Sequence, residues 1–335
     1  MKSPIFDKEM KPQTRREKLV YRKDEFEIVF HYYLDEENNM EFTTTELDEL
    51  NTKQVHNQYR ERYNIPFANE IKDLRETYDL PANKMAEVLG FGVNVYRQYE
   101  SGDIPSISNG RYLQRMKDPK EFLETLVESK VYQGAELEDK KTFIHNIVAM
   151  RKRDTWSHMQ EYVFDHQYPN QFNGYKKPDI QRFIDMVVFF AGNCVELTKT
   201  KLNKLLFYSD FYHFKRTAQA ISGVNYIAIQ YGPVPDHYDI LFSEGQRQNK
   251  IDVRVTLWGD EDKEKHIFTP KGEYQFNEEA FIPSELEVLK YVLESIGKKS
   301  TKEIIELSHK EKAWADNETQ QALISYNYAF ELCTI

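Results

Sequence analysis

Four side chains in the C-terminal half of the chain have the types that acid–base and metal chemistry uses: Asp210, His213, His237 and His309. Asp210 and His213 are three positions apart, so on a helix their carboxylate and imidazole would share one face and could bind a metal ion or relay a proton. Alternatively, a buried helix uses such a pair to satisfy backbone or hydroxyl partners. Because no nucleophile with a base and no third ligand is evident, we predict no catalytic residue, no metal and no cofactor. A metal-dependent hydrolase is the minor alternative.

Tyrosines gather around a glycine-proline segment in the same half. The run Tyr231 to Pro235 (YGPVP) predicts a stiff turn ahead of a helix at 236–242, with Gly232 and Pro233 as scaffold. Aromatic side chains held on such a turn lose little entropy on docking, so they are candidate anchors for a protein partner. These candidates are Tyr212, Tyr226, Tyr231 and Tyr238.

Polar side chains able to read bases follow a glycine turn in the N-terminal half. Ala86 and Gly90 have the spacing that two closely packed helices joined by a tight turn require. If Val95, Tyr96 and Tyr99 pack inward, the third helix turns polar side chains outward, where asparagine, glutamine and arginine can contact base edges. The predicted DNA-binding residues are Asn94, Arg97, Gln98 and Ser101, with Arg111 and Arg115 as phosphate contacts.

The charge of this segment supports a different function. Residues 65–128 hold eight Lys and Arg against eleven Asp and Glu, a net charge of −3, whereas DNA-binding domains are usually basic. The alternative to DNA binding is a helical bundle used for protein contacts. We favour DNA binding because a dimeric module needs only a local basic face.

Periodicity predicts the elements that position the N-terminal candidates. Alternating apolar and charged residues within 1–50 predict a small β ribbon, with a turn at 35–39. Proline and glycine then delimit a five-helix bundle that ends near Ser129. Its helices are predicted from Pro66 to Tyr78, from Pro81, over 93–100, and as two short helices between 106 and 128 that are split at Asp118-Pro119.

The C-terminal half is predicted to place helices around one β hairpin. An apolar stripe over 180–191 predicts one helix, and leucines and phenylalanines around most of 199–216 predict a buried central helix. Apolar residues alternate with polar ones over 251–257, and 266–269 can form the partner strand, so these segments predict the hairpin. Serine and glutamate three positions apart predict helix caps at Ser284 with Glu287 and at Ser300 with Glu303. The chain is therefore predicted to be α+β and mostly helical.

Composition argues against several classes of protein. No apolar run approaches the roughly 20 residues of a membrane helix, and the N-terminus lacks a signal-peptide pattern, so we expect a cytoplasmic protein with no membrane contact. Two cysteines cannot form a disulfide framework. Cys194 and Cys333 lie among apolar neighbours, which predicts buried reduced thiols.

Charge limits how the chain could contact nucleic acid. The net charge of −10 argues against sequence-independent affinity and favours a basic protein partner. The basic run 11–23 could touch phosphates, but a solvated loop is the preferred interpretation.

Three runs in the N-terminal half carry a family resemblance: TTTELDELNTKQVHNQYR, MAEVLG and GFGVNVYRQYESGDIPS. Over about residues 20–128 the chain resembles the MqsA-like antitoxins, which join a zinc ribbon to a helix-turn-helix of the Cro/repressor type. The resemblance implies base reading by Asn94, and a different operator because the second reading position, commonly Arg, is Gln98. The chain departs from the family in having no cysteine before Cys194, so the ribbon cannot hold zinc through thiolates and is expected to hold by packing alone.

Three further runs carry a second resemblance: LNKLLFYSDFYHFKRT, ISGVNYIAIQYGPVP and IIELSHKEKAWADN. Over about residues 175–335 the chain resembles the SocA-like domain of antitoxins, also called Panacea. Members of that family neutralise unrelated protein toxins through this domain, and some are described as adaptors that deliver a toxin to a protease. The resemblance implies that the C-terminal half binds a cognate protein toxin.

These observations predict the antitoxin of a bacterial type II toxin–antitoxin pair, which masks its toxin and represses its own operon. The alternative is a stand-alone transcriptional regulator with a C-terminal sensor domain. A symmetric operator DNA would require a homodimer or two copies bridged by toxin. Four parts are predicted: a zinc-less ribbon with a connecting helix at 1–64, a helix-turn-helix domain at 65–129, a packed connector at 130–178 and a toxin-neutralising domain at 179–335.

Overall fold

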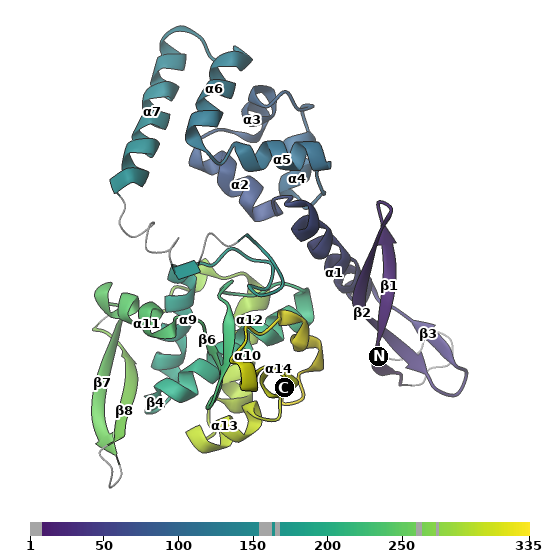
Figure 1. Ribbon diagram of the computed structural model, residues 1–335, viewed down its shortest axis with the longest axis vertical. Helices are drawn as coiled ribbons and strands as arrows, with labels where there is room; N and C mark the ends of the chain where they lie inside the picture. The colour runs from purple at the N-terminus through teal and green to yellow at the C-terminus, as the bar shows by residue number, and fades with distance from the viewer. Residues whose placement is uncertain (1–8, 154–162, 165–167, 259–262, 273–274) are drawn as a thin grey trace. The chain divides into compact units, whose positions relative to one another are not determined.

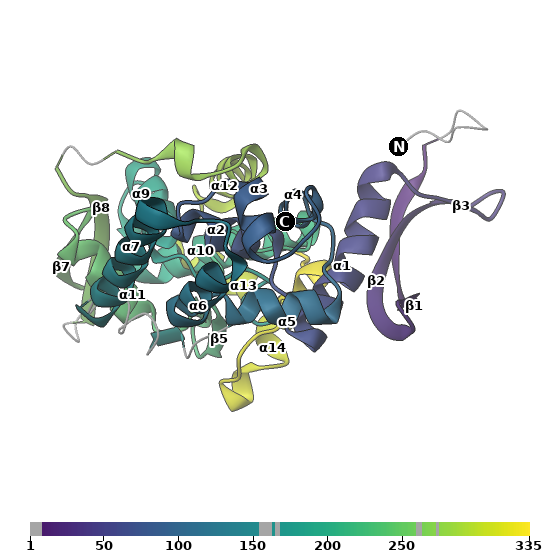
Figure 2. The ribbon, with the colours of Figure 1, turned by 90° about the horizontal axis from the view of Figure 1, so that it is seen from above.

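The computed structural model describes residues 9–153, 163–164, 168–258, 263–272 and 275–335 (Figures 1 and 2). Its contacts divide the chain into two compact units. Unit 1 holds the described residues up to Leu19, then Glu27–Gln54 and Pro169–Ile335; unit 2 holds Val20–Phe26 and the described residues of Val55–Tyr168. The chain is mostly helical with small antiparallel sheets, which confirms the predicted α+β class.

The division into units differs from the four predicted parts, which stay a prediction. The contacts group most of the N-terminal ribbon with the C-terminal residues, and helix α1 (Thr45–Tyr63) continues from unit 1 into unit 2. Residues 154–162 and 165–167 of the predicted connector lie outside the described residues.

The N-terminal ribbon is a three-stranded sheet of β1 (Lys11–Tyr21), β2 (Asp24–Asp35) and β3 (Met40–Phe42), in that order. Arg22 and Lys23 join β1 to β2, and their φ values of 48° and 79° are typical of the primed turns that close hairpins. The predicted solvated loop over 11–23 is therefore wrong. Residues 11–21 form a strand in which exposed residues mostly alternate with half-buried ones. Its charges lie on both faces: Lys11, Arg16 and Lys18 are exposed, whereas Arg15 and Glu17 are half-buried.

Side-chain amides of α1 complete the edge of β2 that β3 leaves open. Asn51 accepts from the His31 N–H at 2.8 Å and donates to the His31 carbonyl at 3.0 Å. Gln54 makes the same pair of bonds with Val29, at 2.9 and 2.8 Å. Because each amide supplies one acceptor and one donor, as a neighbouring strand would, α1 closes this edge.

Unit 2 is built from α2 (Ala68–Thr77), α3 (Ala82–Val88), α4 (Val95–Glu100), α5 (Ile107–Arg115), α6 (Pro119–Ser129) and α7 (Gly134–Arg153). The helices predicted between 66 and 128 are confirmed, including the break at Asp118-Pro119. There the Asp118 side chain caps α6 by accepting from the Lys120 N–H. Their shared core includes Ile144 of α7, so the bundle does not end near Ser129. An apolar face on α7 needs burial, and α6 provides it.

The C-terminal helices of unit 1 surround α10 (Lys199–Thr217) (Figure 1). Residues 201–211 of α10 are all buried, which confirms the predicted central helix. Its neighbours include α9, α12, α13 and the 3-10 helix at Tyr326–Glu331. The other helices are α9 (Ile180–Asn193), α11 (Tyr238–Arg247), α12 (Pro283–Ile296), α13 (Thr301–Ser308) and α14 (Lys312–Ala315), with 3-10 turns at Glu278–Ala280 and Glu318–Gln320.

Two small sheets flank this helical core. The predicted hairpin is confirmed as β7 (Ile251–Trp258) and β8 (Lys263–Pro270), which β4 (Leu197–Thr198) extends in the order β4–β8–β7. The second sheet pairs β5 (Tyr226–Ile229) with β6 (Gly232–Pro235). The predicted turn over 231–235 is therefore wrong, since most of it is a strand. Prolines are tolerated there because no other described strand pairs with the outer edge of β6.

Two further predictions need correction. Helix α12 begins earlier than expected: Glu285, not Glu287, accepts the N-terminal amide, from Ile282 at 3.0 Å. The cap at Ser300 with Glu303 is confirmed. Cys194 is half-buried and Cys333 is exposed, so the predicted burial of both thiols is wrong. Among the described helices, none combines the length and apolar character that crossing a membrane requires.

Candidate functional site

Helix α4 turns the predicted base-reading residues toward solvent. Asn94, Arg97, Gln98 and Ser101 are exposed. Tyr96 is buried, and its hydroxyl donates to the Ile71 carbonyl at 2.7 Å, which fixes the rotation of α4. The turn before α4 contains Gly90 at a φ of 67°, the conformation predicted for it.

These side chains differ in how free they are. Within the described residues, the side chains of Asn94, Arg97 and Gln98 make no hydrogen bond or ion pair. The Ser101 hydroxyl donates to the Arg97 carbonyl at 2.9 Å. Arg111 and Arg115 are exposed, but Arg115 is paired with Glu121, so a phosphate would have to replace that carboxylate. Their role in DNA binding stays a prediction.

Asp210 is fully buried on α10 and acts as a hydrogen-bond acceptor for the chain that follows. One oxygen accepts from the backbone N–H groups of Ile221 and Ser222, both at 2.8 Å. The other accepts from the Ser222 hydroxyl and from the Tyr226 hydroxyl, the latter at 2.9 Å. Burial raises the pKa of Asp210 even though these donors favour its ionised form. The carboxylate therefore anchors the segment that leads into β5.

His213 is also buried and has partners on both nitrogens. Nδ1 lies 2.7 Å from the Gln219 carbonyl, and since a carbonyl only accepts, Nδ1 carries the proton. Nε2 then accepts from the Ser284 hydroxyl at 3.3 Å, which ties α10 to α12. Burial lowers the pKa of His213 to about 4.

This pKa predicts an acid-sensitive fold. Unfolded His213 binds a proton near pH 6.5, whereas folded His213 stays neutral until about pH 4, so the unfolded state gains protons first and stability falls as pH decreases between these values. We expect His213→Gln, which can still donate to Gln219 but cannot take up a proton, to flatten this part of the stability–pH curve. Urea unfolding from pH 7 to 4.5 measures it. Parallel curves for both proteins would contradict the assignment.

The four side chains considered for catalysis do not form one site. Asp210 and His213 use their polar atoms in separate bonds, His237 is exposed beside Asp236, and the His309 ring stacks on Trp314 at 3.9 Å. No cluster of three metal-ligating side chains occurs in the part of the chain that the structure describes. Asp210 and His213 instead join segments of unit 1.

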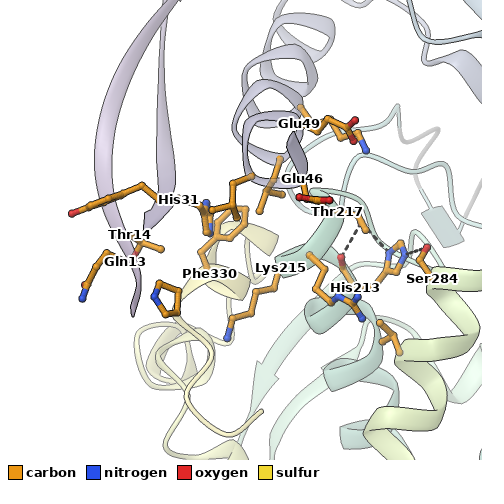
Figure 3. Close-up of a pocket in the computed structure, with 17 residues that line it drawn as sticks. Gln13, Thr14, His31, Glu46, Glu49, His213, Lys215, Thr217, Ser284 and Phe330 are labelled. Atoms are coloured by element: carbon orange, nitrogen blue, oxygen red, sulfur yellow. Dashed lines mark hydrogen bonds between the residues drawn. The ribbon is translucent and has the colours of Figure 1, made fainter. Parts of the chain in front are cut away.

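Unit 1 contains a cavity of about 690 Å³ (Figure 3). One wall comes from the ribbon and α1, and the opposite wall from α10, α12 and Phe330. His213, Thr217 and Ser284 form a hydrogen-bonded group on its lining. Lys215 also lines it, with Nζ donating to the carbonyls of Leu332 and Ile335. The volume falls in the range of small-ligand sites.

The predicted partner-binding tyrosines lie in different environments. Tyr226 is fully buried and bonded to Asp210, so it cannot present a surface. Tyr231 is 59% exposed at the turn between β5 and β6. Tyr212 is half-buried and stacks on Tyr291 with ring centroids 4.7 Å apart. Tyr238 is half-buried near the Lys199 ammonium.

A lysine that the sequence did not single out supports β6. Lys204 of α10 is fully buried, and its Nζ donates to the Pro233 carbonyl at 2.9 Å. Burial lowers its pKa to about 7. The backbone of Gly232 lies so close to α10 and α13 that an added Cβ would be 2.6 Å from Lys204 Cε and 2.5 Å from Ser308 Oγ. The sequence did contain a signal for this role: Lys204 lies in a helix that is apolar on most sides, where a lysine is expected to be buried.

Comparison with known proteins adds information on the segment that includes these contacts. Residues 202–315 match the family model of the Panacea domain of SocA-like antitoxins. The match covers about a third of the chain, from α10 to α14, and includes Lys204, Asp210, Gly232 and Ser308. It supports the resemblance predicted for the C-terminal half, whereas the MqsA-like resemblance of the N-terminal half stays a prediction. Searches among curated proteins and among solved structures found no match.

Proposed function

We propose that this protein is the antitoxin of a bacterial type II toxin–antitoxin pair. Residues 179–335 bind a cognate protein toxin and cover its active surface, and no turnover is involved. The observation that carries the proposal is the match of residues 202–315 to the Panacea domain of SocA-like antitoxins. The polar groups buried in this segment are consistent with a binding scaffold, because Asp210 and His213 have structural partners.

Co-expression tests the proposal. We expect the product of the neighbouring gene to inhibit growth when expressed alone, and this chain to restore growth and to co-purify with it. Tyr231→Ala is expected to weaken the complex by about tenfold, because an exposed aromatic side chain on a fixed turn is a typical anchor. Val195→Ala, at another exposed residue of unit 1, is the control. A neighbouring product that neither inhibits growth nor associates with the chain would refute the proposal.

We further propose that α3 and α4 bind operator DNA and repress the operon. Two short helices joined at Gly90, with free polar side chains on the exposed face of the second, are compatible with major-groove reading. The net charge of −3 over 65–128 restricts this contact to a local face.

Substitution on α4 should separate DNA binding from toxin neutralisation. Arg97→Ala is expected to weaken binding to the upstream DNA by about ten- to a hundredfold and to relax its sequence preference, because a bidentate contact to a base is lost. Asn94→Ala should relax the preference at another position. Growth rescue should survive both changes. Lys120→Ala, an exposed cation on α6, is the matched control. Unchanged footprints for the α4 variants would contradict the proposal.

The cavity favours a second candidate function, a transcriptional regulator with a sensor domain. A volume of about 690 Å³ with a hydrogen-bonded group on its lining would suit a small ligand. Two results together would favour this candidate. The product of the neighbouring gene would not inhibit growth, and a metabolite would raise the melting temperature of the protein and change its affinity for DNA.

A further inference from the structure

The β7–β8 hairpin extends beyond the helices of unit 1, with β7 on its outer side in both views (Figures 1 and 2). β7 is the last strand of the sheet β4–β8–β7, and no other described strand pairs with it. Alternate residues of β7 therefore direct their N–H and C=O groups away from β8. An open edge of eight residues is a template for pairing with another strand.

One face of this edge strand is apolar and becomes more exposed toward the tip. Ile251 is 1% exposed, Val253 is partly exposed, Val255 is 50% exposed and Leu257 is 67% exposed. These residues alternate along β7, so they share one face. Proteins protect such edges with prolines, bulges, short strands or charged side chains. β7 has a regular register with β8 over its whole length, and its charged residues are Asp252 and Arg254. The edge is therefore available for pairing with a strand whose charges complement these two.

We propose that β7 pairs with β7 of a second copy of this chain, in antiparallel orientation about a two-fold axis at Val253. The charges on the other face favour this register. Asp252 and Arg254 are both exposed, and in this pairing Asp252 of each copy lies opposite Arg254 of the other, so two complementary pairs form at once. Ile251 lies opposite Val255 on the apolar face.

The register is selective because neighbouring ones are less favourable. An axis at Arg254 would place the two guanidinium groups opposite each other, which destabilises a strand pair. Within the described residues Arg254 has no ion pair. The Val253 N–H donates to Asp252 Oδ1 at 3.1 Å, and the pairing replaces this bond. The two sheets then join into one antiparallel sheet of six strands. This dimer supplies the two-fold symmetry that a palindromic DNA site requires, and it forms without toxin.

Charge exchange on the full-length chain tests the pairing. The wild type should be a dimer at micromolar concentration, measured by light scattering and sedimentation. Arg254→Asp places two carboxylates opposite each other, and Asp252→Arg places two guanidinium groups opposite each other, so each variant alone should raise the dissociation constant at least about tenfold. An equal mixture of the two variants should form a heterodimer, because one copy then carries Asp and the other Arg at both positions 252 and 254. Each of the two cross pairs joins one carboxylate to one guanidinium group. The double variant Asp252→Arg with Arg254→Asp should also dimerise.

Controls exclude a general charge effect or a folding defect. Lys290→Asp makes the same charge change at an exposed site on α12 and should leave the dimer intact. Recovery of the dimer in the mixture shows that both variants are folded. A monomeric wild type, a dimer that is insensitive to Arg254→Asp, or a mixture that stays monomeric would overturn the pairing. Loss of toxin binding in these variants without loss of the dimer would assign the edge to the toxin and would also overturn it.

Discussion

Asp210→Ala should cost about 3–5 kcal/mol of unfolding free energy, the largest effect that we expect from a single substitution. The fully buried carboxylate accepts from two backbone N–H groups and two hydroxyls, and alanine leaves these donors unsatisfied beside a new cavity. The segment from Ile221 to β5 should detach from α10. Urea unfolding at pH 7 measures the loss, and growth rescue should fall with the folded fraction.

Ser209, next to Asp210 on α10, provides the control. Ser209 is equally buried, but its hydroxyl makes one bond, to the Leu205 carbonyl four residues earlier, which is itself a helix acceptor. Ser209→Ala should therefore cost only about 1 kcal/mol. Asp210→Asn, which keeps the volume and one acceptor oxygen, should lie between the two. Equal losses for Ser209→Ala and Asp210→Ala would show that the carboxylate is not the anchor.

Gly232→Ala should destabilise unit 1 by about 3 kcal/mol or more, for two reasons that add. The backbone there has a φ of 99°, which L residues rarely adopt. The new methyl group would also overlap Lys204 Cε and Ser308 Oγ, both fully buried and unable to move into solvent. Thermal and urea unfolding measure the loss. The adjacent Tyr231 should lose its fixed position, so binding to the co-expressed toxin should weaken as well.

Gly272 provides the matched control within unit 1. It also has a positive φ, of 60°, but an added Cβ would meet no described atom within 4 Å. Gly272→Ala should therefore show the backbone cost alone, about 1 kcal/mol. If the two variants were equally stable, the close approach of β6 to Lys204 would not contribute to stability.

The local elements were predicted well where short-range physics decides them. Helices α2 to α6 follow from apolar periodicity, with Pro81 before α3, the break at Asp118-Pro119 before α6 and Gly90 in the turn. The hairpin of β7 and β8 follows from alternation. The predictions that failed lie where a distant segment decides the outcome. The run 11–23 became a strand because β2 pairs with it, and 232–235 became one because β5 does.

The candidate sites follow the same distinction. The exposure of Asn94, Arg97 and Gln98 was predictable, because the apolar face of a short helix fixes its polar face. The burial of Tyr226 was not, since it depends on Asp210 accepting its hydroxyl from a separate element. The importance of Lys204 was hidden for the same reason. A lysine is normally exposed, and only the approach of Gly232 and Pro233 shows what this one holds.

The sequence by itself therefore determined the α+β class, most of the helices, the cap at Ser300 and the match of 202–315 to an antitoxin domain, because these depend on residue order and local periodicity. Only the tertiary structure decided that Asp210 and His213 join segments of unit 1, and that β7 is left as an open edge. The physical reason is that desolvation and hydrogen-bond satisfaction depend on which distant groups meet, and spacing along the chain does not specify them.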